Sequence, residues 1–129
     1  MATSESLQFY RCSHCGNIVQ MIAASGVPVV CCGEPMDRLL ANTVEASHEK
    51  HVPVVRREGD VLRVDVGSAP HPMLAEHFIE WIALQTDRGF YRRLLSPGEE
   101  PHAQFTLLEE TPVAVYAYCN LHGLWKTAF

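Results

Sequence analysis

Four cysteines in the first part of the chain have a spacing suited to metal binding. They form a C-x-x-C pair and, after a gap of fifteen residues, an adjacent pair: Cys12, Cys15, Cys31 and Cys32. A C-x-x-C segment turns both sulfurs to one side of a tight knuckle, and soft thiolate sulfur selects zinc or iron in tetrahedral geometry. We therefore expect one metal ion at these residues. Since four sulfurs complete a tetrahedral site, we expect the intervening His14 to face solvent.

A second group combines one thiol with several imidazoles. Cys119 lies near the C-terminal end of the sequence, and His122 follows three positions later. One thiolate with several histidines suits iron or copper that changes oxidation state, because a structural zinc site normally uses more sulfur. The other candidate ligands in this part of the chain are His48, His51, His71, His77 and His102.

The local sequence sorts these histidines only in part. His71 lies between two prolines, which hold the backbone extended and commit the ring to one direction. His51 precedes Val-Pro at the start of a predicted strand, and this is a rigid position for a ligand. Spacing does not exclude His48, three residues earlier, as the ligand instead. His102, in the polar stretch GEEPHAQ, is expected to be a solvated loop residue. A blue-copper site is an alternative, although no methionine follows His122 as that site requires.

The composition limits the class of protein. A chain of 129 residues is long enough for one domain plus a small metal-stapled module. The chain has five cysteines, and this odd number argues against a disulfide framework. The formal net charge of -5 argues against nucleic acid and anionic membranes as partners, since both attract basic surfaces. No apolar run approaches the roughly 20 residues of a membrane helix, and the first ten residues lack the pattern of a secretion signal. We therefore expect a soluble, cytoplasmic protein.

A change of composition near residue 37 divides the chain. Residues 1–37 contain short apolar pieces and four cysteines, and residues 38–129 contain longer β-type runs separated by turns. The dipeptide Gly59-Asp60 lies between two β-branched runs and predicts a hairpin over residues 52–66. Four later runs, FYRRLL, AQFTLLE, VAVYAYC and LWKTAF, have spacings typical of a β-sandwich or barrel. Periodicity alone allows a helix or a covered strand for HFIEWIALQT, and the turn that follows it favours the strand.

The motifs taken together are similar to those of one family. In order, they are C-x-x-C followed by C-C, then EKHVP, then HPM with a histidine shortly after, and finally C-N-x-H-G-x-W. This order resembles desulfoferrodoxin, the two-iron form of superoxide reductase, from about Phe9 to the end of the chain. The resemblance implies an all-β protein, with a small desulforedoxin-like metal module at residues 1–37 and an immunoglobulin-like β-sandwich at residues 38–129. It also implies a homodimer.

The resemblance assigns the metal ligands as well. The first of two iron ions would be held in a tetrahedral site by Cys12, Cys15, Cys31 and Cys32. The second would be held in a square-pyramidal site by four equatorial imidazoles and one axial sulfur, from His51, His71, His77, His122 and Cys119. The remaining histidines, His14, His48 and His102, match no ligand of the family.

The activity that the resemblance implies is that of an enzyme, superoxide reductase. Ferrous iron would give one electron to superoxide to form hydrogen peroxide, and rubredoxin or a similar electron donor would reduce the iron again. Lys50 would attract superoxide and orient water for proton delivery, and the carboxylate of Glu49 would bind the ferric iron once product has left. Two other functions stay open: an electron-transfer protein, rubredoxin-like or blue-copper-like, without catalysis of its own, and a zinc-stapled binding protein.

Overall fold

The structure is a computed structural model that describes residues 7–129 of the chain. Almost all of its regular elements are β-strands, as the sequence predicts. Contacts between residues divide it into two compact units, residues 7–40 and Ala41–Phe129. Each unit carries one of the two groups of candidate metal ligands.

The unit of residues 7–40 has only short strands. They are β1 (Gln8–Arg11), β2 (Ile18–Met21), β3 (Val30–Cys31), β4 (Glu34–Pro35) and β5 (Asp37–Arg38). One sheet has the strand order β2-β1-β5, and β3 pairs with β4. Phe9, Cys12 and Met36 are its buried apolar residues among those described. So small a core contributes little to stability, and bound metal is therefore expected to supply much of the folding free energy of this unit.

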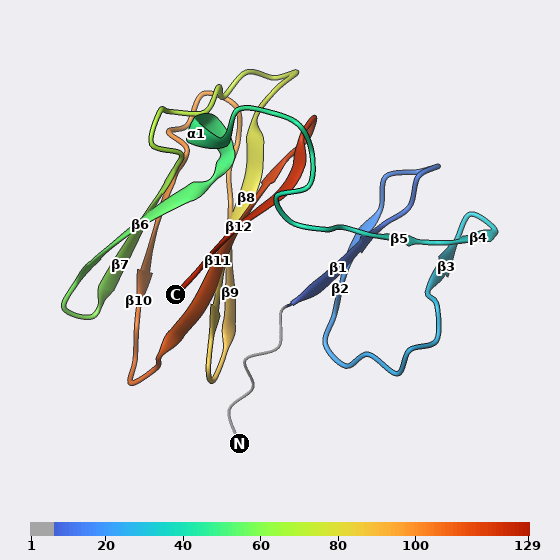
Figure 1. The fold of residues 1–129 in the computed structure, drawn as a ribbon, viewed down its shortest axis with the longest axis horizontal. Coiled ribbons are helices and arrows are strands. Elements are labelled where there is room, and N and C mark those ends of the chain that lie inside the picture. The colour runs from blue at the N-terminus through green and yellow to red at the C-terminus, as the bar shows by residue number, and fades with distance from the viewer. Residues whose placement is uncertain (1–6) are drawn as a thin grey trace. The chain divides into compact units, whose positions relative to one another are not determined.

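The unit Ala41–Phe129 is a sandwich of two antiparallel sheets. Its elements are α1 (His48–His51), β6 (Pro53–Glu58), β7 (Val61–Val66), β8 (Ile79–Thr86), β9 (Phe90–Leu94), β10 (His102–Thr106), β11 (Pro112–Cys119) and β12 (Gly123–Ala128). The strand orders are β10-β7-β6 and β12-β11-β8-β9 (Figure 1). Seven strands divided in this order between two sheets give the immunoglobulin-like arrangement, which confirms the predicted fold class.

The core lies between the two sheets and contains side chains from both. Val64 and Phe105 come from the three-stranded sheet, and Ile82 and Val115 come from the four-stranded one. In β7 burial alternates from residue to residue, as it does in a strand with one face covered. This core holds the strand ends at fixed positions, and the candidate ligands lie at those ends.

The ambiguous segment HFIEWIALQT forms strand β8. It pairs with β11 on one side and with β9 on the other, and seven of its eight residues are buried. The prediction of a strand that is covered on both sides is therefore confirmed. The predicted hairpin is present too, with Gly59 at a φ of 58° in the turn between β6 and β7. A glycine adopts this left-handed conformation without steric cost.

One element differs from the expectation. His51 is predicted to lie at the start of a strand, but in the structure it is the last residue of α1, a single helical turn. The strand begins two residues later, at Pro53. Isolated helices of this length are unstable in water, so no periodic pattern in the sequence announces them. The turn changes the direction in which His51 and the two residues before it face.

At the end of the strands opposite the candidate ligands, a hydrogen-bonded carboxylate joins the loop between β10 and β11 to strands β8 and β9. The hydroxyl groups of Tyr91 and Thr86 donate to Glu110, each at 2.7 Å, and the bond from Tyr91 is the main cause that lowers the pKa of this carboxyl group. A group whose pKa is lower in the folded state stabilises the fold above its unfolded-state pKa and loses this contribution as the pH falls through the folded value.

We therefore expect acid to destabilise the wild-type protein more steeply than the variant Glu110→Gln. The difference should develop between about pH 5 and pH 3, because the unfolded-state pKa of glutamate is about 4.3. Urea unfolding at a series of pH values measures it. Parallel curves for the two proteins would contradict the assignment.

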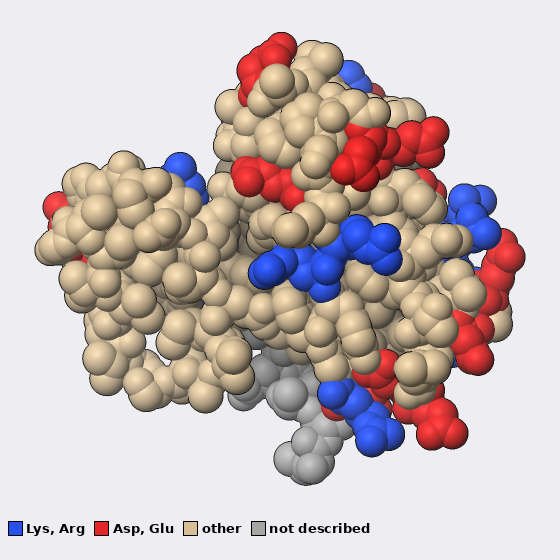
Figure 2. Space-filling view, turned by 180° about the vertical axis from the view of Figure 1, so that it is seen from behind, with Lys and Arg blue, Asp and Glu red and all other residues tan. Residues whose placement is uncertain are grey.

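The surface charge agrees with the acidic balance of the sequence. On the face shown in Figure 2, Asp and Glu side chains lie on several sides of a short band of Lys and Arg, so this face has no extended basic surface. Among residues 7–129, no helix has the length and apolar character required to cross a membrane.

Candidate metal centres

The strand register brings five candidate ligands to one end of the sandwich. Cys119 ends β11, where it pairs with Ile79 at the start of β8 and with Gly123 at the start of β12. The start of β6 lies beside the end of β7, since Pro53 pairs with Val66. The segments next to these strand ends carry four of the histidines: His51, His71, His77 and His122.

These four imidazoles form a closed ring. The centroids of neighbouring rings are 4.6 Å apart for His51 and His71, and 4.7 Å apart for His71 and His77. They are 5.1 Å apart for His77 and His122, and 4.9 Å apart for His122 and His51. The diagonal pair, His51 and His77, is 6.4 Å apart. Sides of similar length with a longer diagonal describe a square, as four equatorial ligands of one ion would.

The distances between the nitrogen atoms fit a single metal ion. Nε2 of His51 lies 3.1 Å from Nε2 of His71 and 3.1 Å from Nδ1 of His122. Two nitrogens that bind one ion at a right angle, each at about 2.1 Å, lie about 3.0 Å apart. The ligand atoms of a group of four residues also lie within 4.8 Å of one another, those of His51, His77, Cys119 and His122. This mixed nitrogen and sulfur donor set fits iron.

Backbone carbonyl groups fix the orientation of two of the rings. Nδ1 of His51 lies 2.7 Å from the carbonyl oxygen of Ser47, and Nδ1 of His71 lies 2.7 Å from that of Pro72. Each Nδ1–H therefore donates to the backbone, which leaves Nε2 with its lone pair toward the centre of the square. Nε2 of His77 is buried and has no hydrogen-bond partner among the residues that the structure describes. A metal ion would satisfy this nitrogen.

Burial keeps these side chains ready for a cation. It lowers the pKa of His71 to about 4, and it lowers the pKa of His51 and of His77. The neutral imidazoles that result are the form that binds metal. Cys119 is wholly buried, and burial raises the pKa of its thiol. A cation next to the sulfur favours the thiolate, so metal binding and ionisation of Cys119 support each other.

Trp125 is a supporting residue that sequence reasoning misses. It is fully buried, and its ring stacks on that of His51 with the centroids 4.8 Å apart. Its Nε1–H donates to the carbonyl oxygen of His122 at 3.1 Å. Trp125 therefore holds two corners of the square. The motif C-N-x-H-G-x-W contains it, but only packing shows what it contacts.

Asn120 supports the histidine at a third corner. Its side-chain oxygen accepts a hydrogen bond from the N–H of Phe78 at 3.0 Å, and its side-chain nitrogen donates to the carbonyl of Glu76 at 3.0 Å. These two residues flank His77 in the sequence, so Asn120 holds the chain on both sides of that ligand. Because Asn120 also follows Cys119, it links the sulfur ligand to this part of the ring.

The structure separates the ligand histidines from the others. His48, which spacing does not exclude, is exposed and meets the ring of Trp125 edge-on at 5.3 Å, outside the ligand group. The prediction that His102 lies in a solvated loop is wrong, because it is the first residue of β10. There it pairs with Asp65 of β7, and its Nδ1 lies 3.0 Å from the carboxylate. Because of this pairing, His102 belongs to the sheet rather than to the loop before it.

Two exposed charged residues stand next to a ligand. Glu49 and Lys50 belong to α1 and directly precede His51. Besides burial and the adjacent His122, the positive charge of Lys50 lowers the pKa of His77, which lies diagonally across the square from His51. Lys50 thus places a positive charge one residue from His51 in the chain. A cation in this position attracts anions to it.

The four cysteines of the first unit form the other candidate centre. The sulfur atoms of Cys12, Cys15, Cys31 and Cys32 lie within 4.8 Å of one another. The Sγ atoms of Cys15 and Cys31 are 3.6 Å apart, and two sulfurs at tetrahedral positions, each about 2.3 Å from one ion, lie about 3.8 Å apart. The adjacent pair reaches this centre because Cys32 has a φ of 52°, a left-handed conformation that is rare for residues other than glycine.

The thiols of this group influence each other's ionisation. The N–H of Cys15 is the main cause that lowers the pKa of Cys12 to about 6. The sulfurs of Cys15 and Cys12 raise the pKa of Cys32 to about 12, and they raise the pKa of Cys31 as well. One thiolate forms easily, and the other thiols keep their protons more firmly because they share them in hydrogen bonds within the group. A bound cation takes the place of these protons.

His14 faces solvent, as the sequence predicts. Its side chain is 50% exposed, and its Nε2 lies 2.9 Å from a carboxylate oxygen of Glu34. His14 lies between the first two cysteines and Glu34 follows the second pair by two residues, so this contact joins the two ligand segments from outside.

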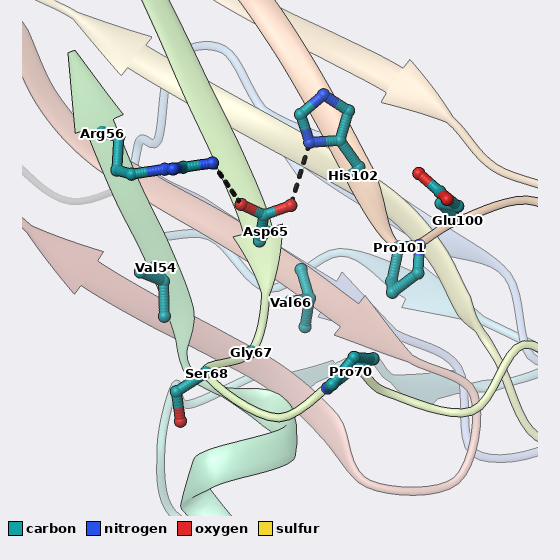
Figure 3. A pocket seen from close by; sticks show the side chains of 10 residues that line it. All are labelled: Val54, Arg56, Asp65, Val66, Gly67, Ser68, Pro70, Glu100, Pro101 and His102. Carbon is teal, nitrogen blue, oxygen red and sulfur yellow. Dashed lines mark hydrogen bonds and ion pairs between the residues drawn. The ribbon is translucent and has the colours of Figure 1, made fainter.

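A separate cavity of about 450 Å³ lies beside the sheet β10-β7-β6 of the sandwich. Asp65 lies between two side chains there, 3.6 Å from the guanidinium of Arg56 and 3.0 Å from Nδ1 of His102 (Figure 3). Its described lining includes none of the predicted metal ligands. Two residues of the loop after β7, Gly67 and Ser68, line one end of it.

Comparisons with known proteins cover nearly the whole chain. A family model described as desulfoferrodoxin matches residues 43–128, and a model of the N-terminal domain of desulfoferrodoxin matches residues 4–39. A desulfoferrodoxin of Syntrophotalea carbinolica is 48% identical over 124 residues, which are 96% of this chain and 98% of the relative. A desulfoferrodoxin homolog of Archaeoglobus fulgidus is 46% identical with the same coverage. The crystal structure of the superoxide reductase from Treponema pallidum matches with a TM-score of 0.80 and 35% identity, over 95% of this chain and 99% of that one.

Proposed function

The chain belongs to the desulfoferrodoxin family, and on that premise we propose that its site of four histidines and one cysteine reduces superoxide to hydrogen peroxide. Each superoxide would take up one electron and two protons. His51, His71, His77, His122 and Cys119 would hold an iron ion, which would supply this electron when bound. The similar structure from Treponema pallidum is named a superoxide reductase, which supports the proposal.

The observation that carries this function is the square of imidazoles with a single sulfur beside it. Nε2 of His51 lies 3.1 Å from a nitrogen of each neighbouring ring, and Sγ of Cys119 lies 3.9 Å from Nδ1 of His122. Five protein ligands leave a six-coordinate ion with one position for a small substrate. A purely structural site would have no such position, so the donor set favours a reactive centre.

Each residue of the site has a distinct part in this reaction. The imidazoles would hold the ion, and the thiolate of Cys119 would donate electron density to it, as a sulfur ligand does in haem-thiolate enzymes. Lys50 attracts the superoxide anion and orients water that delivers protons. In the resting protein the carboxylate of Glu49 would occupy the place of the substrate once peroxide has left.

The electron donor and the assembly complete the proposal. We propose that rubredoxin or a similar small electron-transfer protein reduces the site after each turnover, that the protein is a homodimer and that it is cytoplasmic. Residues 1–37 would form the iron module and residues 38–129 the catalytic domain. The four-cysteine iron would relay or store electrons in a secondary role.

The variant Cys12→Ser tests this division of labour. Cys12 is buried in the core of the first unit, so its loss should remove the four-cysteine iron. We expect iron to fall from two to one ion per chain. Superoxide reduction by the pre-reduced protein should stay within about twofold of wild type, as for independent sites. Loss of both iron ions, or of the activity, would contradict a secondary role.

An absorption spectrum of the iron-loaded, oxidised protein tests the proposed function against its rivals. Ferric thiolate sites absorb visible light, and two centres should give two sets of bands, whereas a zinc-stapled binding protein would be colourless. Superoxide should then disappear faster with the reduced protein than without it. If the protein is coloured but superoxide decays at its spontaneous rate, the chain is an electron carrier without catalysis.

A further inference from the structure

The turn that carries Glu49 and Lys50 cannot hold its position by itself. Helix α1 has only four residues, and an isolated helix of that length is unstable in water. In a longer helix the carbonyl of Glu49 would accept the N–H of the residue four positions later. That residue is Pro53, which has no N–H, so the carbonyl needs a donor from elsewhere in the fold.

The loop after β7 provides these donors. We call residues 67–69 the strap. The N–H of Ala69 donates to the carbonyl oxygen of Glu49 at 2.8 Å, and the hydroxyl of Ser68 donates to the same oxygen at 3.2 Å. Two residues further on, His71 donates its N–H to Val66 at 2.9 Å, which fixes the end of the loop at a metal ligand. The strap therefore joins α1, the turn that carries Glu49 and Lys50, to the histidine square.

Gly67 allows the strap to lie directly against the turn. A Cβ atom at this position would lie 2.6 Å from the carbonyl oxygen of Glu49 and 2.9 Å from that of Val52. It would also lie 3.1 Å from the carbonyl carbon of Lys50. All three are backbone atoms, so a side chain at residue 67 forces the turn to move. Figure 3 shows the strap passing between the cavity and α1.

We propose that Gly67 and Ser68 are positioning residues that set the place of Lys50 and Glu49 relative to the histidine square. This inference rests on the proposed function, since it concerns the groups that receive superoxide. The strap touches no substrate and acts only through the turn. Its effect on the reaction should therefore vanish when the side chains of Glu49 and Lys50 are absent.

A set of variants tests this dependence. Gly67→Ala displaces the turn and Ser68→Ala removes one of the two donors to Glu49. Gly89→Ala is the matched control, because its Cβ would meet only side-chain atoms, of Glu110 and Tyr91, in the turn between β8 and β9. All three are made in the wild-type protein and in the double variant E49A/K50A. The second-order rate constant for superoxide, the iron content and the visible spectrum are measured for each.

In the wild-type background we expect a tenfold lower rate for Gly67→Ala, about the loss that a small misplacement of a catalytic group causes. Loss of one hydrogen bond in Ser68→Ala should lower the rate about threefold. In the E49A/K50A background, Gly67→Ala and Ser68→Ala should each change the rate constant by no more than about twofold, the limit for effects that do not couple. Iron content and spectrum should match wild type throughout.

Hydrogen exchange supplies a readout that does not need activity. If the strap holds the turn, the amide of Ala69 should exchange at least about tenfold faster in Gly67→Ala than in Gly89→Ala, as weakened local hydrogen bonds permit. An unchanged exchange rate, or a rate constant for Ser68→Ala equal to wild type, overturns the inference. So does an equal loss of rate in both backgrounds, because the strap would then act through the ligands. A wild-type protein that fails to reduce superoxide instead refutes the proposed function.

Discussion

Replacement of Cys119 by serine is expected to abolish the second iron centre while the first remains. Cys119 contributes the single sulfur of the site, is wholly buried and ends a central strand. A serine hydroxyl is a harder and far less acidic ligand than a thiol, so it does not replace thiolate at iron. Iron should fall from two ions per chain to one. The visible bands of the histidine and cysteine site should disappear, and superoxide reduction should fall by more than about a hundredfold.

His102→Ala is the matched control for that experiment. It removes an imidazole that pairs with Asp65 and belongs to no ligand group, so iron content and colour should not change. Far-UV circular dichroism shows whether Cys119→Ser retains its β-sandwich, which is expected because serine has nearly the size of cysteine. If Cys119→Ser keeps both iron ions and the colour of wild type, the assignment of the sulfur ligand is wrong.

Removal of the charge of Lys50 should slow the reaction with superoxide at an intact iron site. The whole chain carries a net charge of -5, which repels an anionic substrate, and Lys50 provides a positive charge next to the ligand His51. Lys50→Ala should lower the second-order rate constant by about ten- to a hundredfold at low salt, the range of electrostatic steering. Rates measured at several salt concentrations should depend less on salt in the variant.

Lys126→Ala is a matched control for this charge. Lys126 is the only other lysine of the chain, and its ammonium group lies 5.5 Å from the ring centroid of Tyr116 on β11. The net charge changes equally in both variants. A lower rate constant for Lys50→Ala than for Lys126→Ala therefore reports the position of Lys50. Equal rates for Lys50→Ala and Lys126→Ala would leave only the general charge of the protein as an explanation and would remove Lys50 from the mechanism.

The sequence predicts the β-sandwich well because its strands carry short-range signals. The hairpin over residues 52–66 has β-branched runs on both sides of Gly59, and both strands lie where these runs do. Strand β8 is less obvious, since its apolar run fits two periodicities. Its pairing with β11 and β9 decides the matter, and such pairing is a property of the whole fold rather than of the segment.

The site can be predicted only as far as ligand types and spacing allow. Spacing does not separate His48 from His51, because the one-turn helix that turns His51 into the square depends on donors from a loop about twenty residues later in the sequence. His102 looks like a loop residue in its polar context, and only cross-strand pairing with Asp65 places it in β10. Packing partners such as Trp125 carry no signal of their own, since a buried tryptophan fits any core.

The yield of hydrogen peroxide per superoxide distinguishes reduction from dismutation. Protein with both iron sites loaded and reduced is mixed with a limiting amount of superoxide, and peroxide, dioxygen and oxidised iron are counted. We predict one peroxide and one oxidised iron for each superoxide consumed, with no dioxygen released. One peroxide and one dioxygen for every two superoxide ions, with the iron still reduced at the end, would show dismutation and contradict the account.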